Sequence, residues 1–308
     1  MPAAVARRPP PASALVPGAG PVSPGAARPF LKWAGGKKQL LGAFVPLFPR
    51  VAPTTGYHEP FLGSGAVFFH VKAQLGFRRC TLSDNNSDLI AAFSAVRNDA
   101  DQVIAALERH RARHNEQYFY QVRAIDPDQL AAMSEVERGA RLIYLNKTCF
   151  NGLYRVNSRG LFNVPMGRYA NPGICDPDQI RAASAALRQV SLSSGEFSSV
   201  LGRARPGDVV YFDPPYVPLS TTAYFTAYTK AAFGEAEQRQ LAEVYRQLDA
   251  RGCRVMLSNS DTPFVRQLYR GFDVRQLMAR RLINSKSDRR GQVAEVVVLN
   301  YCPPPAAA

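Results

Sequence analysis

The chain alternates short apolar runs, which end in polar or glycine-rich turns, with stretches of helical periodicity. A strand is predicted at residues 56–60, followed by a glycine-rich turn at 61–65 and by a helical pattern at 66–71. A second strand is predicted at 79–83 and ends at Asp84, and a further helical pattern follows it. Strand, turn, helix and strand in this order are typical of a nucleotide-binding α/β unit.

The middle of the chain interrupts this alternation. Residues 98–147 show helical periodicity, and residues 148–169 are rich in Asn, Gly and Arg with little periodicity. The pattern predicts one open α/β sheet that is interrupted by a mostly helical insertion. The later predicted strands are 209–212, 254–258 and 295–301, and a helix is predicted at 233–248.

The most distinctive motif is a loop at the carboxyl end of the predicted strand 209–212. Its two prolines fix φ and remove two backbone donors, so the loop is stiff and its carbonyls need outside donors. A carboxylate, free carbonyls and a flat ring suit a planar group that carries an NH2, such as a nucleobase edge. The alternative is a strand-ending turn with a solvated aspartate. The loop consists of Asp213, Pro214, Pro215 and Tyr216.

A glycine turn follows the first predicted strand, residues 56–60, which contains Glu59. Gly63 and Gly65 allow the backbone to approach a ligand closely, and Asp84 comes 19 residues after Gly65, a spacing at which carboxylates meet ribose hydroxyls. No G-x-G-x-x-G motif occurs, so a dinucleotide is disfavoured. Together with Asp213, the acids favour a nucleoside with a cationic substituent, such as S-adenosylmethionine. The alternative is a turn that serves packing alone.

The only tryptophan, Trp33, lies beside a glycine pair between Lys32 and Lys37. A bulky aromatic in this context is typical of a wall against a bound ring, and the two lysines could reach a carboxylate, a phosphate or a base. Burial of Trp33 in the core is the alternative.

Composition narrows the class of partner. A net charge of +14 and a pI of about 9.9 favour a polyanion, unless the charge reflects a general compositional bias. Five scattered cysteines without a C-x-x-C motif favour reduced thiols in the cytoplasm and no zinc site, and we interpret His110 and His114 as a solvated pair. No apolar run is long enough for a membrane span. Residues 1–28 and 303–308 have the composition of disordered tails.

Five segments, in order, resemble the Dam family of DNA adenine-N6 methyltransferases (D12 class, alpha group), which includes several modification enzymes of restriction systems. The resemblance implies a Rossmann-like methyltransferase fold, α/β, with a doubly wound, mostly parallel seven-stranded sheet whose last strand is antiparallel. It implies a catalytic domain that binds S-adenosylmethionine, at 29–97 and 179–302, and a helical DNA-recognition insertion at 98–178. The matching segments are 30–37, 59–69, 83–90, 146–169 and 212–216.

The resemblance also implies roles for single residues. The cofactor positions match Trp33, Lys37, Glu59, Phe61, Gly63, Gly65, Asp84 and Asp213. The catalytic loop matches Asp213, Pro214, Pro215 and Tyr216. The DNA-binding positions match Lys32, Phe150, Asn151, Leu153, Arg155, Pro165, Arg168 and Tyr169.

Several of the DNA-binding matches are more specific. Lys32 matches a residue that contacts the first guanine of a GATC site, and Arg155 matches an arginine that reads the third base pair. Pro165 would lie near a thymine methyl and Tyr169 near a phosphate. Family members often carry Tyr where this chain has Phe150, so stacking is kept there and a hydroxyl contact is lost. The basic stretch 280–291 would grip phosphates, or else is a solvated charge run.

The implied reaction transfers a methyl group from S-adenosylmethionine to N6 of an adenine in double-stranded DNA, without a metal, after the base is flipped out. Asp213 and the Pro214 carbonyl would accept both N6 hydrogens. The alternatives are cytosine-N4 transfer, glutamine-amide methylation and a DNA-binding module without catalysis, which the intact Asp84 and glycine turn oppose. We expect a cytoplasmic monomer with no membrane attachment.

Overall fold

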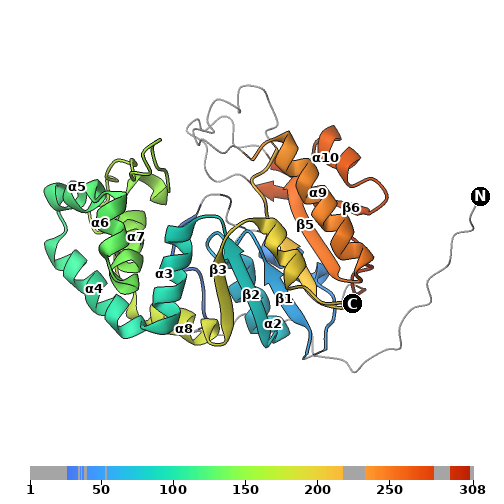
Figure 1. The fold of residues 1–308 in the computed structure, drawn as a ribbon, viewed down its shortest axis with the longest axis horizontal. Coiled ribbons are helices and arrows are strands. Elements are labelled where there is room, and N and C mark those ends of the chain that lie inside the picture. The colour runs from blue at the N-terminus through green and yellow to red at the C-terminus, as the bar shows by residue number, and fades with distance from the viewer. Residues whose placement is uncertain are drawn as a thin grey trace, which may run out of the picture.

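The computed structural model contains one seven-stranded sheet with helices packed on it (Figure 1). It describes residues 26–33, 35, 37, 40–52, 54–217, 233–280 and 292–305, so most of the predicted N-terminal tail, the last three residues and most of the basic stretch 280–291 lie outside the described residues. The strands are β1 (Gly56–Glu59), β2 (Arg79–Asp84), β3 (Val190–Ser194), β4 (Val209–Phe212), β5 (Arg254–Ser260), β6 (Asp273–Arg280) and β7 (Gln292–Leu299).

The strand order β3-β2-β1-β4-β5-β7-β6 confirms the predicted doubly wound sheet. β1 pairs in parallel with β2 on one side and with β4 on the other. β2 also pairs in parallel with β3, and β4 pairs in parallel with β5. β7 is antiparallel to both of its neighbours, β5 and β6. The edge strands β3 and β6 were not predicted. Only Val190 of β3 is buried, so this strand lacks the apolar run that marks a central strand.

Helices cover the sheet and build a lobe beside it (Figure 1). The predicted helices at 66–71 and 233–248 and in the region 98–147 are present. The helices are α1 (Leu41–Phe44), α2 (Ala66–Leu75), α3 (Ser87–Asn98), α4 (Ala100–Arg113), α5 (Glu116–Ala124), α6 (Pro127–Ala132), α7 (Glu135–Thr148), α8 (Pro177–Leu187), α9 (Glu235–Ala250) and α10 (Pro263–Leu268), with 3-10 turns η1 (Val45–Leu47), η2 (Phe150–Gly152) and η3 (Phe197–Gly202).

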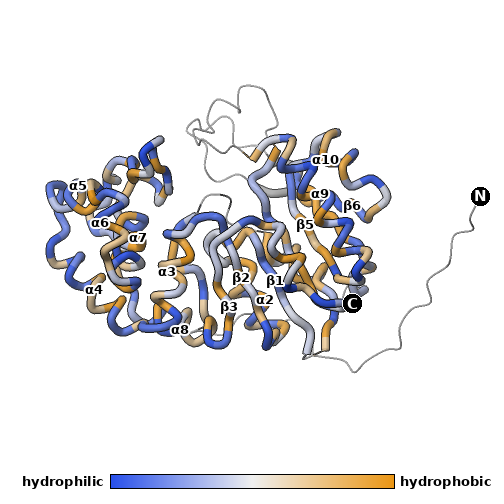
Figure 2. The backbone as a smooth tube through the Cα atoms, viewed as in Figure 1, coloured by the Kyte–Doolittle hydropathy of each residue, from blue (hydrophilic) through white to orange (hydrophobic). Residues whose placement is uncertain are grey.

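The fully buried strand β4 shows why both faces of the sheet need a cover. Successive side chains of a strand point to opposite faces. Val209 and Tyr211 join a cluster that includes α2 and α3, whereas Val210 and Phe212 join a second cluster with α9 and α10. Figure 2 shows apolar positions throughout both the sheet and the helical lobe. The two clusters bury β4 on both faces, and the predicted catalytic loop, residues 213–216, follows its carboxyl end.

The helical lobe joins the sheet domain where α7 packs on α3. A Cβ on Gly139 of α7 would lie 2.7 Å from the Cβ of Ala95 and 3.2 Å from the Cα of Ala92, so this close approach requires glycine. A capping box formed by Ser134 and Glu137 begins α7 by satisfying backbone donors. The contact fixes the lobe, and with it the segment that follows α7, relative to the sheet.

The cysteines are free thiols. Burial raises the pKa of Cys80, Cys149 and Cys253 to about 11, so these side chains stay protonated and unreactive near neutral pH. Among the described residues, no helix has the length and apolar character that a membrane crossing needs.

A buried carboxylate at the amino end of β4 ties the central strands together. Asp208, 3% exposed, accepts hydrogen bonds from the backbone of Gly56 at 2.8 Å and of Arg205 at 2.9 Å. It also contacts His58 Nε2 at 3.1 Å and the guanidinium of Arg79 at 2.5 Å. Burial alone would raise the pKa of Asp208, but these donors hold it well below its ordinary value. The charged form is therefore stabilised in the native state.

We predict that Asp208→Asn lowers the free energy of unfolding by about 3 kcal/mol at neutral pH, because it removes one partner of a buried charged cluster. A carboxyl group with a depressed native pKa contributes stability that is lost as the pH falls towards that pKa, so the difference between wild type and variant should shrink on acidification. Urea unfolding at several pH values measures this. Asp128→Asn, on the exposed first turn of α6, is the control and should cost under about 1 kcal/mol. Equal effects of the two substitutions would contradict the assignment.

Candidate active site

Three acidic side chains meet at the carboxyl edge of the parallel strands. Glu59 ends β1, Asp84 ends β2, and Asp213 directly follows β4. Burial raises the pKa of all three carboxyl groups, and repulsion from the other two acids adds to the rise for Glu59. Glu59 also accepts a hydrogen bond from the hydroxyl of Tyr57 at 2.5 Å. An edge with several desolvated carboxyl groups favours a cationic ligand.

The Asp213 carboxylate is held by a cation and a hydroxyl. Lys37 Nζ lies 2.9 Å from Asp213 Oδ1, and Ser258 Oγ donates to the same oxygen at 2.9 Å. The hydroxyl of Ser258 in turn contacts that of Tyr211 at 3.0 Å. Burial raises the pKa of Asp213, while Lys37 and Ser258 counter part of that rise. Since the side chain is 20% exposed, it remains accessible to a ligand.

The Tyr216 ring lies beside this carboxylate. Lys37 Nζ is 4.4 Å from the centroid of the ring, so one ammonium contacts both the carboxylate and the ring. The Tyr216 hydroxyl donates to Glu295 Oε2 of β7 at 2.7 Å, which fixes the plane of the ring. Lys37 also donates to the Gly35 carbonyl at 2.9 Å. The arrangement joins an N–H donor, a carboxylate and an aromatic ring in a single site.

The glycine turn is fastened to the end of β2. Asp84 accepts hydrogen bonds from the backbone N–H of Gly63 at 3.1 Å and of Asn86 at 3.0 Å. Gly63 and Gly65 have φ values of 49° and 68°, a region that favours glycine. A Cβ on Gly63 would lie 3.1 Å from the ring of Trp33. The turn therefore presents bare backbone beside an indole and a carboxylate.

Aromatic rings form a wall on the other side of this turn. Phe61 stacks on Phe197 with a centroid distance of 5.5 Å and meets Phe212 and Phe233 edge to face at 6.3 and 5.5 Å. Phe61 is only partly buried, so part of its ring is available to a ligand. Of these rings, the family resemblance implied a cofactor contact for Phe61 alone, because Phe197 and Phe233 come from distant segments.

Trp33 is partly buried and stacks on Tyr154 with a centroid distance of 5.5 Å and an interplanar angle of 27°. The Tyr154 hydroxyl donates to Asp88 Oδ2 of α3 at 3.0 Å. Trp33 therefore lies between the glycine turn and the segment that follows α7. Both a packing role and a role as a wall against a ligand are compatible with this position.

The backbone of Lys32 is clamped to the segment after α7. The buried Asn146 side chain accepts from Lys32 N at 2.8 Å and donates to the carbonyls of Lys32 and Gly152 at 2.7 and 2.8 Å. A Cβ on Gly152 would lie 2.6 Å from the Cβ of Lys32, so glycine is needed there. Lys32 Nζ lies 4.6 Å from the centroid of the Tyr169 ring. Two predicted DNA contacts, Lys32 and Tyr169, are thus neighbours.

The predicted recognition segment folds back on itself through antiparallel bridges, Cys149 to Met166 and Val156 to Phe162. Phe150 and Leu153 are 50% and 40% exposed, unusual values for large apolar side chains. Arg155 lies against Asn163, with its Nε donating to Asn163 Oδ1 at 2.6 Å. The other predicted contacts in this segment that are exposed are Asn151, Pro165 and Arg168.

Sequence reasoning missed several residues of the site. Ser258, Gln238, Asn259 and Glu295 all contact the loop 213–217, but they come from β5, α9 and β7. One signal was present: the predicted strand 254–258 ends in Ser and is followed by Asn and Ser. Polar side chains at the carboxyl end of a buried strand are a common source of site residues.

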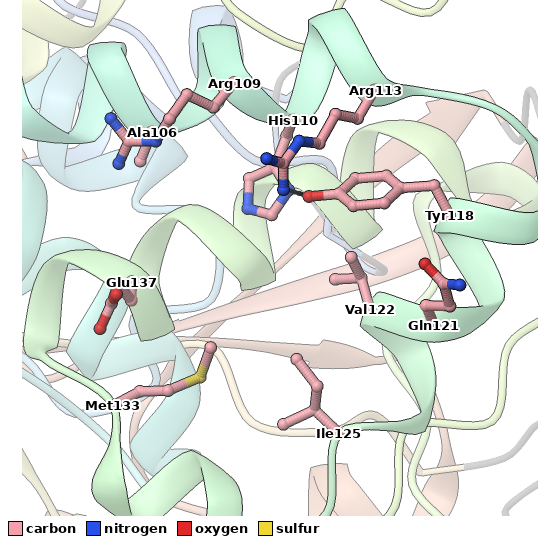
Figure 3. Close-up of a pocket in the computed structure, with 10 residues that line it drawn as sticks. All are labelled: Ala106, Arg109, His110, Arg113, Tyr118, Gln121, Val122, Ile125, Met133 and Glu137. Carbon is pink, nitrogen blue, oxygen red and sulfur yellow. Dashed lines mark hydrogen bonds between the residues drawn. The ribbon is translucent and has the colours of Figure 1, made fainter.

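A hollow of about 400 Å³ in the helical lobe is separate from this site (Figure 3). The guanidinium groups of Arg109 and Arg113 lie well apart in Figure 3, so its charges do not converge on one ligand position. The interpretation of His110 and His114 as a solvated pair is wrong. Their Nδ1 atoms contact the hydroxyls of Tyr118 at 2.8 Å and Tyr144 at 2.9 Å, and burial lowers the pKa of both, to about 4 for His110.

The doubly wound sheet, the glycine turn and the acidic carboxyl edge are those of an α/β protein that binds its ligand at the carboxyl ends of the strands. The family model for D12 class N6 adenine-specific DNA methyltransferases matches residues 33–283, and the chain belongs to this family. The protein is accordingly an enzyme that methylates adenine N6 in DNA. The cytosine-N4, glutamine-amide and non-catalytic alternatives are thereby set aside.

Named relatives cover nearly the whole chain. The Type II methyltransferase M1.LlaDCHI of Lactococcus lactis subsp. cremoris is 42% identical over 89% of this chain and 95% of its own length. The Type II methyltransferase M.MjaIII of Methanocaldococcus jannaschii is 41% identical over 89% of this chain and 99% of its own. The DNA adenine methylase of Escherichia coli K12 is 36% identical over 88% of this chain and 95% of its own.

We predict that acid inactivates the enzyme at a pH above the ordinary pKa of an aspartate, because the pKa of Asp213 is raised. Only the ionised form of Asp213 can accept a hydrogen bond from an N–H group and also bind a cation. Lys37→Met removes the positive neighbour, so the pKa of Asp213 in the free enzyme rises further and the acidic limb of kcat/KM against pH moves to higher pH. The measurement is methyl transfer across pH at DNA concentrations well below KM. Arg188→Met, which removes an exposed charge before the amino end of β3, is the control and should leave the limb in place. An unshifted limb in Lys37→Met would contradict the pairing.

Proposed function

We propose that the enzyme methylates the adenine of GATC sites in double-stranded DNA, with S-adenosylmethionine as methyl donor and the target base flipped out of the duplex. The observation that carries the proposal is the place of the Lys37 ammonium, 2.9 Å from Asp213 Oδ1 and 4.4 Å from the Tyr216 ring centroid. A nitrogen with N–H donors therefore fits between the carboxylate and the ring. The exocyclic amine of a flipped adenine offers the same donors, together with a ring that can stack on Tyr216.

The chemical task of the loop is to activate a weak nucleophile. The lone pair of adenine N6 is delocalised into the ring, so the amine attacks poorly in its planar form. The Asp213 carboxylate and the Pro214 carbonyl accept its two hydrogens and favour tetrahedral geometry, which localises the lone pair for in-line attack. As the bond from N6 to the methyl carbon forms, the bond from that carbon to sulfur breaks. N6 then loses one proton, and Asp213, with its raised pKa, is the base beside it.

The acidic edge fits the donor. S-adenosylmethionine supplies a methyl group on a positively charged sulfur. The described part of the edge offers three carboxyl groups and the ammonium of Lys37, and this balance suits a cationic ligand. Asp84 binds two backbone N–H groups and keeps further lone pairs for hydroxyl donors, since a carboxylate offers about four acceptor positions. Phe61 and Trp33 supply rings near Gly63 against which a nucleoside could pack. Gly65 is the N-cap of α2 and has no side chain to cap the first backbone N–H groups of that helix.

DNA recognition is assigned to the segment after α7 and to Lys32. Phe150 and Leu153 are exposed apolar side chains that suit insertion into a base stack, which supports base flipping. Arg155 and Lys32 supply donors for base edges, Lys32 at the first guanine of the site. Asn151, Pro165, Arg168 and Tyr169 complete the proposed contact surface. The net charge of +14 supplies the attraction to the phosphate backbone.

Asp213→Ala should lower methyl transfer by at least about 100-fold while the protein stays folded, because it removes an oriented acceptor for the reacting amine. Transfer of tritiated methyl groups from S-adenosylmethionine to a GATC duplex measures this, with thermal unfolding as the check on folding. Asp178→Ala, exposed on the first turn of α8, is the control. Turnover near the wild-type rate in folded Asp213→Ala would contradict the assigned role.

Arg155→Ala should lose about 1–3 kcal/mol of discrimination at the third or fourth base pair of the site, the usual cost of one good base contact. Discrimination at the first guanine, assigned to Lys32, should be retained. The measurement is the ratio of kcat/KM for GATC to that for each singly substituted site. Arg159→Ala, in the same exposed segment, is the control and should leave these ratios unchanged. A uniform loss at all sites would make Arg155 a phosphate contact instead.

A further inference from the structure

The loop that carries Asp213 is held by a chain of buried amide side chains. Gln238 Nε2 of α9 donates to the Pro215 carbonyl at 2.9 Å, and Asn259 Nδ2 of β5 donates to Gln238 Oε1 at 3.0 Å. Asn259 Oδ1 accepts from Val217 N at 3.2 Å. Gln238 is 1% exposed and Asn259 is fully buried. A buried amide without hydrogen-bond partners is costly, so both amide side chains must keep these hydrogen bonds in the folded protein. The amide network therefore fixes the position of the loop.

The direction of the amide chain is fixed by its surroundings. Asn259 Oδ1 accepts from the backbone N–H of both Val217 and Ser260, at 3.2 and 2.8 Å. The other end of the Asn259 amide must then be the NH2 group, which donates to Gln238 Oε1. Gln238 consequently turns its own NH2 group to the Pro215 carbonyl. A side chain at position 238 must both donate and accept, and a carboxylate cannot replace it.

Surrounding side chains form hydrogen bonds or ion pairs with most polar atoms of the loop 213–217. Ser258 and Lys37 bind Asp213 Oδ1, Glu295 binds the Tyr216 hydroxyl, and Ser260 Oγ donates to the Val217 carbonyl at 2.6 Å. Among the hydrogen bonds of the described residues, none involves Asp213 Oδ2 or the Pro214 carbonyl oxygen. These two acceptors are therefore unpaired among the described residues, and Pro214 itself is buried.

We propose that Gln238 and Asn259 are positioning residues that aim the Pro214 carbonyl at the reacting amine. Both prolines have a fixed φ, so the direction of this carbonyl depends on a few ψ angles between two anchors. One anchor is the Asp213 carboxylate, held by Ser258, and the other is the Pro215 carbonyl, held by Gln238. The inference rests on the proposed roles of Asp213 and Pro214 and adds the residues that make their geometry reproducible.

The test compares Gln238→Met and Gln238→Glu with Gln240→Met, an exposed control on the same helix. Gln238→Met should lower kcat by about 10- to 100-fold, the scale of a small misplacement of reacting groups, with KM values for DNA and S-adenosylmethionine within about twofold of wild type. In Gln238→Glu, a protonated carboxyl can still donate to the Pro215 carbonyl and a carboxylate cannot. Its deficit in kcat relative to wild type should therefore grow as the pH rises, whereas that of Gln238→Met should not change with pH.

The outcomes separate this inference from the proposed function. Wild-type kcat in both Gln238 variants, a loss that appears in KM alone, or a deficit in Gln238→Glu that does not depend on pH would overturn the positioning role. Gln238→Glu keeps the shape of the side chain and decides the matter if Gln238→Met does not fold. If Asp213→Ala is inactive while the Gln238 variants turn over normally, the positioning inference alone fails. An active Asp213→Ala would overturn the proposed function itself.

Discussion

The site depends on keeping the Asp213 carboxylate charged where most of the surrounding water is excluded. Burial opposes the charge and raises the pKa, while the Lys37 ammonium and the Ser258 hydroxyl support it, each 2.9 Å from the same oxygen. Two further acids, Glu59 and Asp84, end the neighbouring strands, so among the described residues three carboxyl groups face the one ammonium of Lys37. The proposed cationic methyl donor would balance the charge of this edge.

Residues 32–37 join the proposed DNA-contact surface to the predicted catalytic loop. The backbone of Lys32 is clamped by Asn146, the Trp33 ring stacks on Tyr154, and Lys37 reaches Asp213. Parts that would bind DNA, the methyl donor and the target amine are thus joined within six residues of chain. Gly152 leaves no room for a side chain against Lys32, so the proposed recognition segment packs directly on the backbone that carries Lys32 and Trp33.

Much of this arrangement could be predicted from the sequence. Apolar runs mark β4, β5 and β7, and the Asp-Pro-Pro-Tyr loop follows β4. The glycine turn and Asp84 mark the ends of the more polar strands β1 and β2. The edge strands β3 and β6 escaped prediction, since an edge strand buries too little to leave an apolar pattern. Gln238 escaped for another reason: it lies three and four residues before Leu241 and Ala242 on the buried face of α9, but a glutamine in the first turn of a helix is ordinarily taken as exposed. The partners of His110 and His114 likewise come from α5 and α7, and no spacing in α4 indicates them.

The most direct test of the account is a crystal structure of the enzyme with a GATC duplex and a non-reactive analogue of the methyl donor. The account predicts that the target adenine lies outside the DNA duplex and stacks on Tyr216. Its N6 should lie within hydrogen-bond distance of the Asp213 carboxylate and the Pro214 carbonyl. Lys37 Nζ should have moved from the position that it holds between Asp213 and the Tyr216 ring. An adenine that stays in the duplex, or an N6 whose acceptors are other groups while Lys37 remains in place, would contradict it.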